Sequence, residues 1–290
     1  MNMVSKVRER SPLTFNLWIA IFTWVTWYYF GGVQALETLL SNWPVALTMV
    51  FGSFIAGATS EGGGAIAFPV FTKVLHVSPT DAKVFSLAIQ SVGMTAATIL
   101  IIKMRIKVEW FVIRWASLAG IPGIIIGSVF LVPNMEPSLV KMSFTALVTS
   151  FAFTLLVVHQ RVRHVHDSMP NKGATEIAII LLAGLIGGAI SGIVGNGIDI
   201  IVFSVMVLLF RINEKISTPT SVILMAINAL VGFILYTFFL GGFTPLVQSY
   251  WVAAIPVVVI GAPAGALFCA YLSRKFIARM LITLIFIELI

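Results

Sequence analysis

The chain has 290 residues, of which 59% are hydrophobic and only 10% are charged. This composition excludes a soluble domain carrying one membrane anchor and indicates a polytopic membrane protein. The net charge of +7 does not indicate a nucleic-acid partner, because the basic residues stand in short loops between apolar runs, where they set membrane topology.

The N-terminal region, residues 1–43, is expected to comprise a cytoplasmic tail and the first membrane span. The tail carries Lys6, Arg8 and Arg10, and an apolar run from Leu13 to Phe30 follows it. This run lacks a small-residue cleavage site, so it is interpreted as a retained span rather than a signal peptide.

The rest of the chain follows one plan twice: an interrupted apolar element and then three apolar runs. Repeat one covers residues 44–158, a basic cytoplasmic linker covers 159–173, and repeat two covers 174–290. The interrupted elements are Val45 to Leu75 and Ile177 to Phe210. The apolar runs are Val84 to Ile102, Trp110 to Val132, Leu139 to Val158, Ser217 to Leu240, Tyr250 to Leu272 and Phe276 to Ile290.

The two copies share residues at constant spacing. With Gly52 placed on Gly187, an offset of 135 residues, the residues Gly57, Gly62, Phe68 and Ser86 fall on Gly192, Gly197, Phe203 and Ser221. Further along, the offset becomes 141, so that Trp110, Gly120 and Pro122 fall on Trp251, Gly261 and Pro263. Glycine-interrupted apolar segments in corresponding positions of two halves indicate the binding site of a transporter.

The first interruption, Gly57 to Gly64, reads G-A-T-S-E-G-G-G. Glycine costs about 1 kcal/mol per helical position relative to alanine, and an ionised Glu61 at bilayer depth costs at least a few kcal/mol. We therefore expect the helix to break here and the break to form a site. The alternative is a close-packed glycine contact between helices.

The loop charges favour interrupted elements that return to the side from which they enter. With the N-terminus in the cytoplasm, this arrangement places all 18 Lys and Arg residues inside except Lys73, Lys83 and Lys141. The charges do not separate a re-entrant hairpin from two full crossings per element. A leg such as Val45 to Thr59 is about 20 Å long as a helix, too short for a core of about 30 Å, which favours hairpins.

These observations predict an all-α polytopic membrane protein with two inverted repeats and one extra N-terminal span. Each repeat consists of one broken or re-entrant helical hairpin and three spans. Three crossings invert the second copy relative to the first, so the hairpins enter from opposite sides and their tips are expected to meet near the midplane.

The candidate substrate-binding residues lie at the two tips and on the helices that follow them. At the tips, helix N-termini with free backbone N–H groups are expected to hold a small oxyanion. The candidates are Ser60, Glu61, Gly62, Gly63, Gly64, Ser86, Gln90, Gly195, Asn196, Gly197, Ser221 and Asn228. For the four helical residues among them, hydrogen bonding between helices is an equally favoured role. Lys83 is interpreted as an interface lysine in preference to an anion ligand.

Glu61 has two alternative roles. It caps the following helical leg, or it binds and releases a proton and so couples transport to a proton gradient. The proton role is slightly favoured. No cofactor, metal or catalytic residue is expected.

The chain resembles the sulfite exporter TauE/SafE family, also called the toluene sulfonate uptake permeases. The matching features are Ala56-Gly57 leading into Gly62-Gly63-Gly64, Phe68-Pro69, the stretch from Asp81 to Met94, and the second copy at Gly192 to Gly197. The resemblance implies secondary transport of small sulfur-containing anions, such as sulfite or organosulfonates, across a bacterial cell membrane. Glu61 directly before the glycines departs from the commoner motif.

The expected function is therefore secondary transport of such an anion, with export favoured, in the bacterial inner membrane. The expected partners are the anion, the lipid bilayer and protons as a coupling ion, and a homo-oligomer is left open. The alternatives are a passive anion channel of the same fold, a scaffolding subunit, and, less favoured, an intramembrane enzyme built on Glu61 and Asp199.

Overall fold

The computed structural model describes residues 12–59, 68, 70–159 and 165–271. Every named element in these ranges is a helix, which confirms the all-α prediction at this level. The α-helices are α1 (Pro12–Ser41), α2 (Trp43–Ala58), α4 (Pro79–Lys103), α5 (Trp110–Ile126), α6 (Pro137–His159), α7 (Ala174–Val194), α8 (Ile198–Ser204), α9 (Glu214–Ile234) and α10 (Pro245–Tyr271). The shorter helices are η3 (Val70–Val74), η4 (Gly127–Leu131), η5 (Val132–Asn134), η6 (Val205–Leu209) and η7 (Leu235–Phe239). The predicted last span, Phe276 to Ile290, lies outside the described residues.

Several described helices are long and apolar enough to cross a membrane. Five meet this test alone: α4, α5 with η4 and η5, α7, α9 with η7, and α10. The pair α1 and α2 meets it together, bent by 84°, and would make a sixth span. The chain is therefore a multi-pass membrane protein.

The length of α7 corrects one expectation. Both first legs were expected to be too short to cross a membrane, yet α7 has 21 residues, about 31 Å. The corresponding α2 has 16 residues, about 24 Å, as expected. Because α7 is five residues longer than α2, it extends further through the bundle before its glycine break than α2 does.

The N-terminal helix α1 is kinked at Gly32, whose φ of 56° lies in the left-handed region. Glycine adopts this conformation without the steric penalty of a side chain. Before the kink, the indole N–H groups of Trp24 and Trp27 donate to the carbonyl oxygens of Pro256 and Val252, both at 2.9 Å. These bonds attach the predicted first span to α10.

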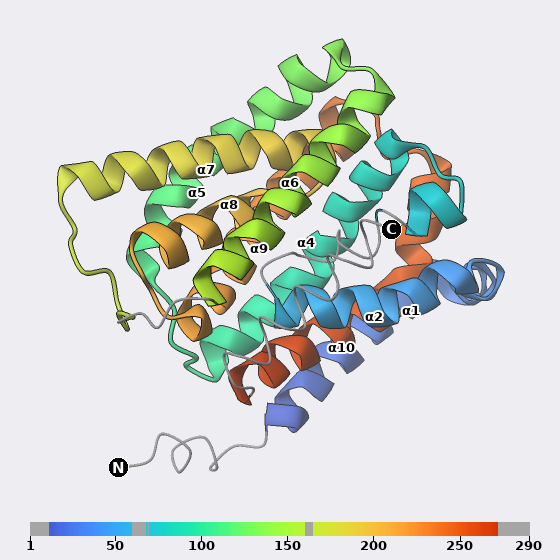
Figure 1. The fold of residues 1–290 in the computed structure, drawn as a ribbon. Coiled ribbons are helices and arrows are strands. Elements are labelled where there is room, and N and C mark those ends of the chain that lie inside the picture. The colour runs from blue at the N-terminus through green and yellow to red at the C-terminus, as the bar shows by residue number, and fades with distance from the viewer. Residues whose placement is uncertain (1–11, 60–67, 69, 160–164, 272–290) are drawn as a thin grey trace.

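Two helix pairs form the flanks of the bundle, and α4 lies between them (Figure 1). On one flank α2 packs against α10, and on the other α5 packs against α7. Backbones touch in both pairs, because a Cβ atom added to Gly57 would meet the Ala262 carbonyl and one added to Gly188 would meet the Gly120 carbonyl. Small residues allow such close packing where the lipid offers no hydrophobic driving force between helices.

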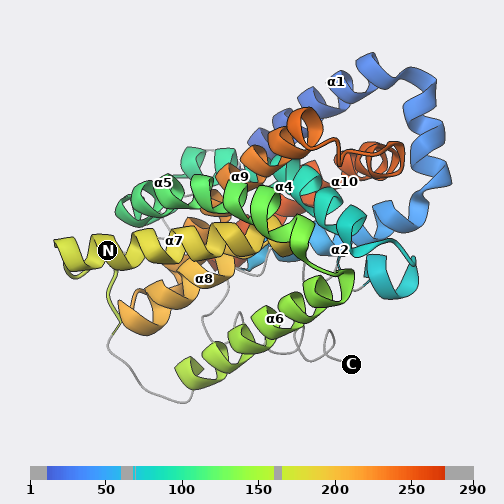
Figure 2. The ribbon, with the colours of Figure 1, turned by 90° about the horizontal axis from the view of Figure 1, so that it is seen from above.

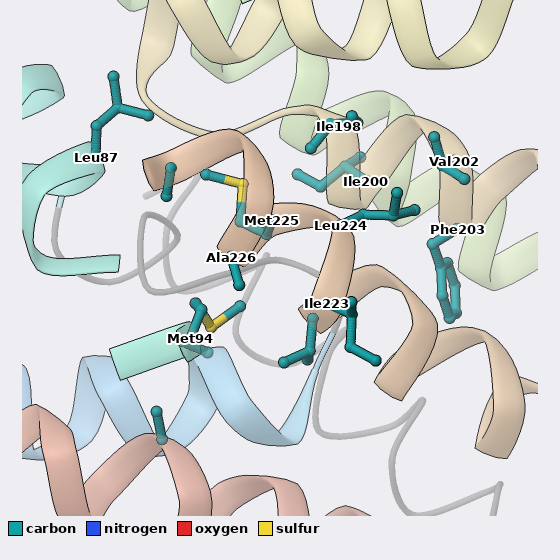
Figure 3. Close-up of a cluster of buried hydrophobic side chains, with 14 of the residues drawn as sticks. Leu87, Met94, Ile198, Ile200, Val202, Phe203, Ile223, Leu224, Met225 and Ala226 are labelled. Carbon is teal, nitrogen blue, oxygen red and sulfur yellow. The ribbon is translucent and has the colours of Figure 1, made fainter. Parts of the chain in front are cut away.

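The apolar core lies where α4, α8 and α9 meet. Figure 3 shows Met94 of α4 beside Ala226 of α9, while Leu224 of α9 lies next to the side chains of α8. Leu87 and Leu224 are fully buried. This packing supports α8, a helix of only 7 residues that would not be stable alone.

The helix α6 stands at the edge of the bundle (Figure 2). It buries one apolar face, on which the Phe144 ring stacks on Phe68 with centroids 4.4 Å apart, and Phe151 contacts Phe203 at 5.7 Å. The chain therefore passes along the core once more before α7 begins.

The segments before α7 and after η6 lie side by side. The N–H of His166 donates to the Arg211 carbonyl at 2.8 Å, and the N–H of Asn213 donates to the His166 carbonyl at 2.9 Å. At the same end, the N–H of Met169 donates to Glu109 Oε2 at 2.8 Å. We call this the Glu109 end of the bundle, formed by residues 104–109, 165–173 and 210–213. The second interrupted element thus leaves this end and returns to it.

The opposite end holds residues 75–78 and 240–244, and we call it the Asp81 end. The Thr244 hydroxyl donates to Oδ1 of Asp81, in the first turn of α4, at 3.4 Å. Asp81 also accepts a hydrogen bond from the Ser78 hydroxyl at 2.7 Å, while the Ser78 oxygen caps the first turn of α4.

Candidate functional site

The second interruption is a turn of three residues, Gly195 to Gly197, between α7 and α8. Gly195 ends α7 with φ of 94°, and its N–H donates to the Ser191 carbonyl at 2.9 Å. A glycine in the left-handed conformation is a common helix end. Asn196 in this turn is 1% exposed, so the break is buried in protein.

The N-terminus of α8 is occupied by side chains of the protein itself. Asp199 Oδ1 accepts hydrogen bonds from the N–H groups of Gly197 and Ile200, both at 3.0 Å. The hydroxyl oxygen of Ser191 accepts one from the N–H of Ile198 at 3.0 Å. The expectation of free N–H groups at this tip is therefore wrong for these three amides. A carboxylate at a helix N-terminus is favoured by the helix dipole, and here Asp199 takes that place.

Ser86 and Gln90 of α4 meet the glycine turn. The Gln90 amide nitrogen donates to the Gly195 carbonyl at 3.1 Å and to the Ser86 hydroxyl at 2.7 Å. The Ser86 hydroxyl is also 3.4 Å from the Gly195 carbonyl. The fold thus brings these three candidates together, and the remaining Gln90 oxygen is buried without a hydrogen-bond partner among the described residues.

This contact places the turn off centre. Ser86 is the eighth residue of α4, about 10 Å from its start at the Asp81 end, whereas the whole helix of 25 residues is about 37 Å long. Gly195 therefore lies beside the part of α4 that is nearer the Asp81 end.

Ser221 and Asn228 of α9 lie elsewhere. The Ser221 hydroxyl donates within its own helix, to the Thr218 carbonyl at 2.8 Å. The Asn228 amide donates to the Gly120 carbonyl of α5 at 3.0 Å. Asn228 thus makes the interhelical hydrogen bond that was the alternative to a substrate contact. The first-tip candidates Ser60, Glu61, Gly62, Gly63 and Gly64 lie outside the described residues.

Lys83 was misinterpreted from the sequence. An interface lysine reaches toward water, but Lys83 is only 1% exposed, and its Nζ lies 4.9 Å from the centre of the Tyr236 ring. A Cβ atom on Gly195 would lie 3.0 Å from the Lys83 carbonyl, so this lysine borders the turn. Its spacing was a usable signal, because Lys83, Ser86 and Gln90 lie three and four residues apart on one face of a helix.

The fold and the site define a multi-pass α-helical membrane transport protein with an interrupted helix whose break is buried among polar side chains. A protein-family model described as Sulfite exporter TauE/SafE matches residues 45–289. The chain belongs to this family, as the glycine motif and its second copy predicted. No curated protein and no solved structure matches the chain. The family is one of transporters, and membership implies transport of sulfite or related sulfur anions.

Proposed function

We propose that the protein is a secondary transporter that exports a small sulfur-containing oxyanion across the bacterial inner membrane, with its N-terminus in the cytoplasm. The observation that carries the proposal is the contact of Ser86 and Gln90 with the Gly195 carbonyl at a buried helix break. Breaks of this kind are tolerated at membrane depth only where protein buries them or they line a cavity. Family membership supports the class of substrate.

The proposed architecture is a pair of inverted repeats. The helix pairing supports it. In the two repeats α2 corresponds to α7 and α5 corresponds to α10, and α2 packs against α10 just as α7 packs against α5. The glycine contacts support it as well: a Cβ on Gly57 would meet the Ala262 carbonyl, and one on Gly192 would meet the Ile124 carbonyl. Gly57 and Gly192 are 135 residues apart, while Ile124 and Ala262 are 138 apart. The two contacts therefore relate α5 to α10 by an offset of 138 residues, about one helical turn less than the offset of 141 found from the sequence.

The Glu109 end is proposed to face the cytoplasm. Of the predicted inside loops, residues 103–114, 165–172 and 211–215 lie at this end, and the inside loops together carry most of the basic residues of the chain. The hydrogen bonds between His166 and the Arg211–Asn213 segment support a second hairpin that enters from the cytoplasm and returns there. An inverted first hairpin would enter from outside.

The anion site is proposed to lie between the two glycine breaks, with Gly195, Asn196 and Gly197 as its external boundary. Gly64 stands at the position that corresponds to Asp199 under the 135-residue offset, so the first tip has no carboxylate at that position. Backbone amides of Gly62, Gly63 and Gly64 are therefore the proposed main donors to the anion. Ser60 and Ser221 are proposed to add hydroxyl groups, and Glu61 is proposed to carry the coupling proton.

The test is transport by purified protein in lipid vesicles. An imposed proton gradient should drive accumulation of labelled sulfite above its equilibrium level. Equilibration without accumulation would favour the passive channel, whereas no sulfite flux and no sulfite binding would contradict transport and favour a scaffolding subunit.

A further inference from the structure

We propose that Lys83, Tyr236 and Ser128 form an oxyanion-binding subsite beside the glycine break, at the Asp81 end of the bundle. The subsite rests on the function proposed above and names the side chains that neutralise and hydrogen-bond the sulfite or sulfonate group. The three residues come from α4, η7 and η4, so the tertiary fold alone brings them together.

Lys83 brings a positive charge into the protein interior. It is among the largest fully buried side chains, and its Nζ lies over the Tyr236 ring, 4.9 Å from the ring centre. Among the described residues, no carboxylate forms an ion pair with it. Cation–π contact holds the ammonium group in place but does not neutralise it. Buried charges in membrane proteins are normally paired or lie on a substrate pathway.

Tyr236 and Ser128 add two buried hydroxyl donors. They are 5% and 2% exposed, and their hydroxyl groups are neighbours. Within the described part of the chain, each of these hydroxyls has at most the other as a hydrogen-bond partner. Buried hydroxyls usually have partners, because leaving one unsatisfied costs about 1–3 kcal/mol. The ammonium and the two hydroxyls therefore share one buried region that offers donors and a positive charge.

The end of α7 borders this region. A Cβ atom on Gly195 would lie 3.0 Å from the Lys83 carbonyl, and one on Gly192 would lie 2.9 Å from the Ser128 hydroxyl oxygen. Glycines at both positions let the last turn of α7 approach the two helices that carry Lys83 and Ser128. The subsite is thus continuous with the turn that Ser86 and Gln90 hold.

The chemistry of the subsite matches a sulfite or sulfonate group. Such a group has three oxygens that share negative charge and only accept hydrogen bonds. Charge-assisted hydrogen bonds from an ammonium group and hydroxyls are stronger than neutral ones. A neutral ligand would leave the Lys83 charge unmatched, so the subsite should select anions.

The experiment measures thermal unfolding of the purified full-length protein with sulfite, with methanesulfonate and with dimethyl sulfone, a neutral analogue. The central variant is Lys83→Met, and the matched control is Lys141→Met, which removes an exposed lysine of α6. The two anions should raise the Tm of the wild type and of the control, whereas dimethyl sulfone should not. Lys83→Met should lose this shift, with an affinity lower by about 100-fold. Without ligand it should be no less stable, because it removes a buried charge.

Two milder variants keep the proposal testable if Lys83→Met does not fold. Tyr236→Phe keeps the ring under the ammonium group, and Ser128→Ala keeps the packing. Each should weaken sulfite binding by about tenfold through loss of one hydrogen bond to a charged ligand. Wild-type affinity in Lys83→Met, or in both hydroxyl variants, would overturn the subsite while leaving the proposed transport intact. A wild type that responds to neither anion would overturn both.

Discussion

The side-chain amide of Gln90 lies 3.1 Å from the carbonyl oxygen of Gly195 and joins α4 to the break between α7 and α8. The carbonyl belongs to a buried turn, so a donor supplied by a neighbouring helix replaces the hydrogen bond that a continuous helix would have made. If α4 moves relative to the second hairpin, this hydrogen bond must break, or the Gly195 turn must move together with α4.

Replacing Gln90 by leucine should remove the donor while keeping most of the side-chain volume. We expect sulfite transport in vesicles to fall at least about tenfold, because the buried Gly195 carbonyl loses its closer donor and keeps only the Ser86 hydroxyl at 3.4 Å. Gln248→Leu is the matched control, since Gln248 is exposed at the start of α10. Equal transport by the two variants would show that the Gln90 contact has no part in function.

Asp199 is predicted to stabilise the second hairpin rather than to bind substrate. Asp199→Ala leaves the buried N–H groups of Gly197 and Ile200 without their acceptor and should lower the free energy of unfolding by about 1–3 kcal/mol. Asp199→Asn keeps a neutral acceptor and should lose less. Thermal unfolding in detergent measures both, and an alanine variant as stable as the wild type would contradict the capping role.

Alanine substitution at Gly195 and at Gly241, two glycines with positive φ, distinguishes the effect of backbone strain from the effect of a steric clash. A Cβ atom on Gly195 would lie 3.0 Å from the Lys83 carbonyl and from Ser86 Cβ, whereas one on Gly241 would meet nothing within 4 Å. Alanine at either position costs about 1–2 kcal/mol of strain. Only Gly195→Ala should also abolish sulfite transport, as measured in vesicles with equal amounts of inserted protein. Loss of transport in Gly241→Ala as well would assign the effect to strain.

The proposed topology predicts which positions an impermeant thiol reagent reaches from outside. The native Cys269 is buried and should be replaced by alanine to remove background labelling. In intact cells, cysteine at Gln34 or Gly242 should react, and cysteine at the exposed Ser168 should react only after the cells are opened. External labelling at Ser168 would refute the inverted hairpin arrangement.

Glu61→Gln tests proton coupling at the first tip. Glutamine keeps the shape of the side chain but cannot titrate, so the variant should still exchange sulfite between vesicles and medium. It should no longer accumulate sulfite when a pH gradient is imposed, because the coupling proton has no carrier. Accumulation with unchanged pH dependence would leave Glu61 as a cap of the following leg.

The sequence alone determined the all-helical membrane class, the family and the order of the helices. Runs such as Val84 to Ile102 and Trp110 to Val132 fall within α4 and α5 with its extensions, because hydropathy and glycine content act locally along the chain. The break at Gly195 was predicted for the same reason. The position of that break along the neighbouring helices was not predicted, because it depends on where α7 starts and on which helices it packs against.

Only the tertiary structure decided which partners the polar side chains meet. Lys83 was expected at the water interface and is buried against Tyr236, more than 150 residues further along the chain. Asn228 reaches the carbonyl of Gly120 rather than a tip, and Asp199 closes the helix N-terminus that was expected to be free. A single sequence records the donors, acceptors and charges, but their pairing depends on contacts between distant helices that no local pattern encodes.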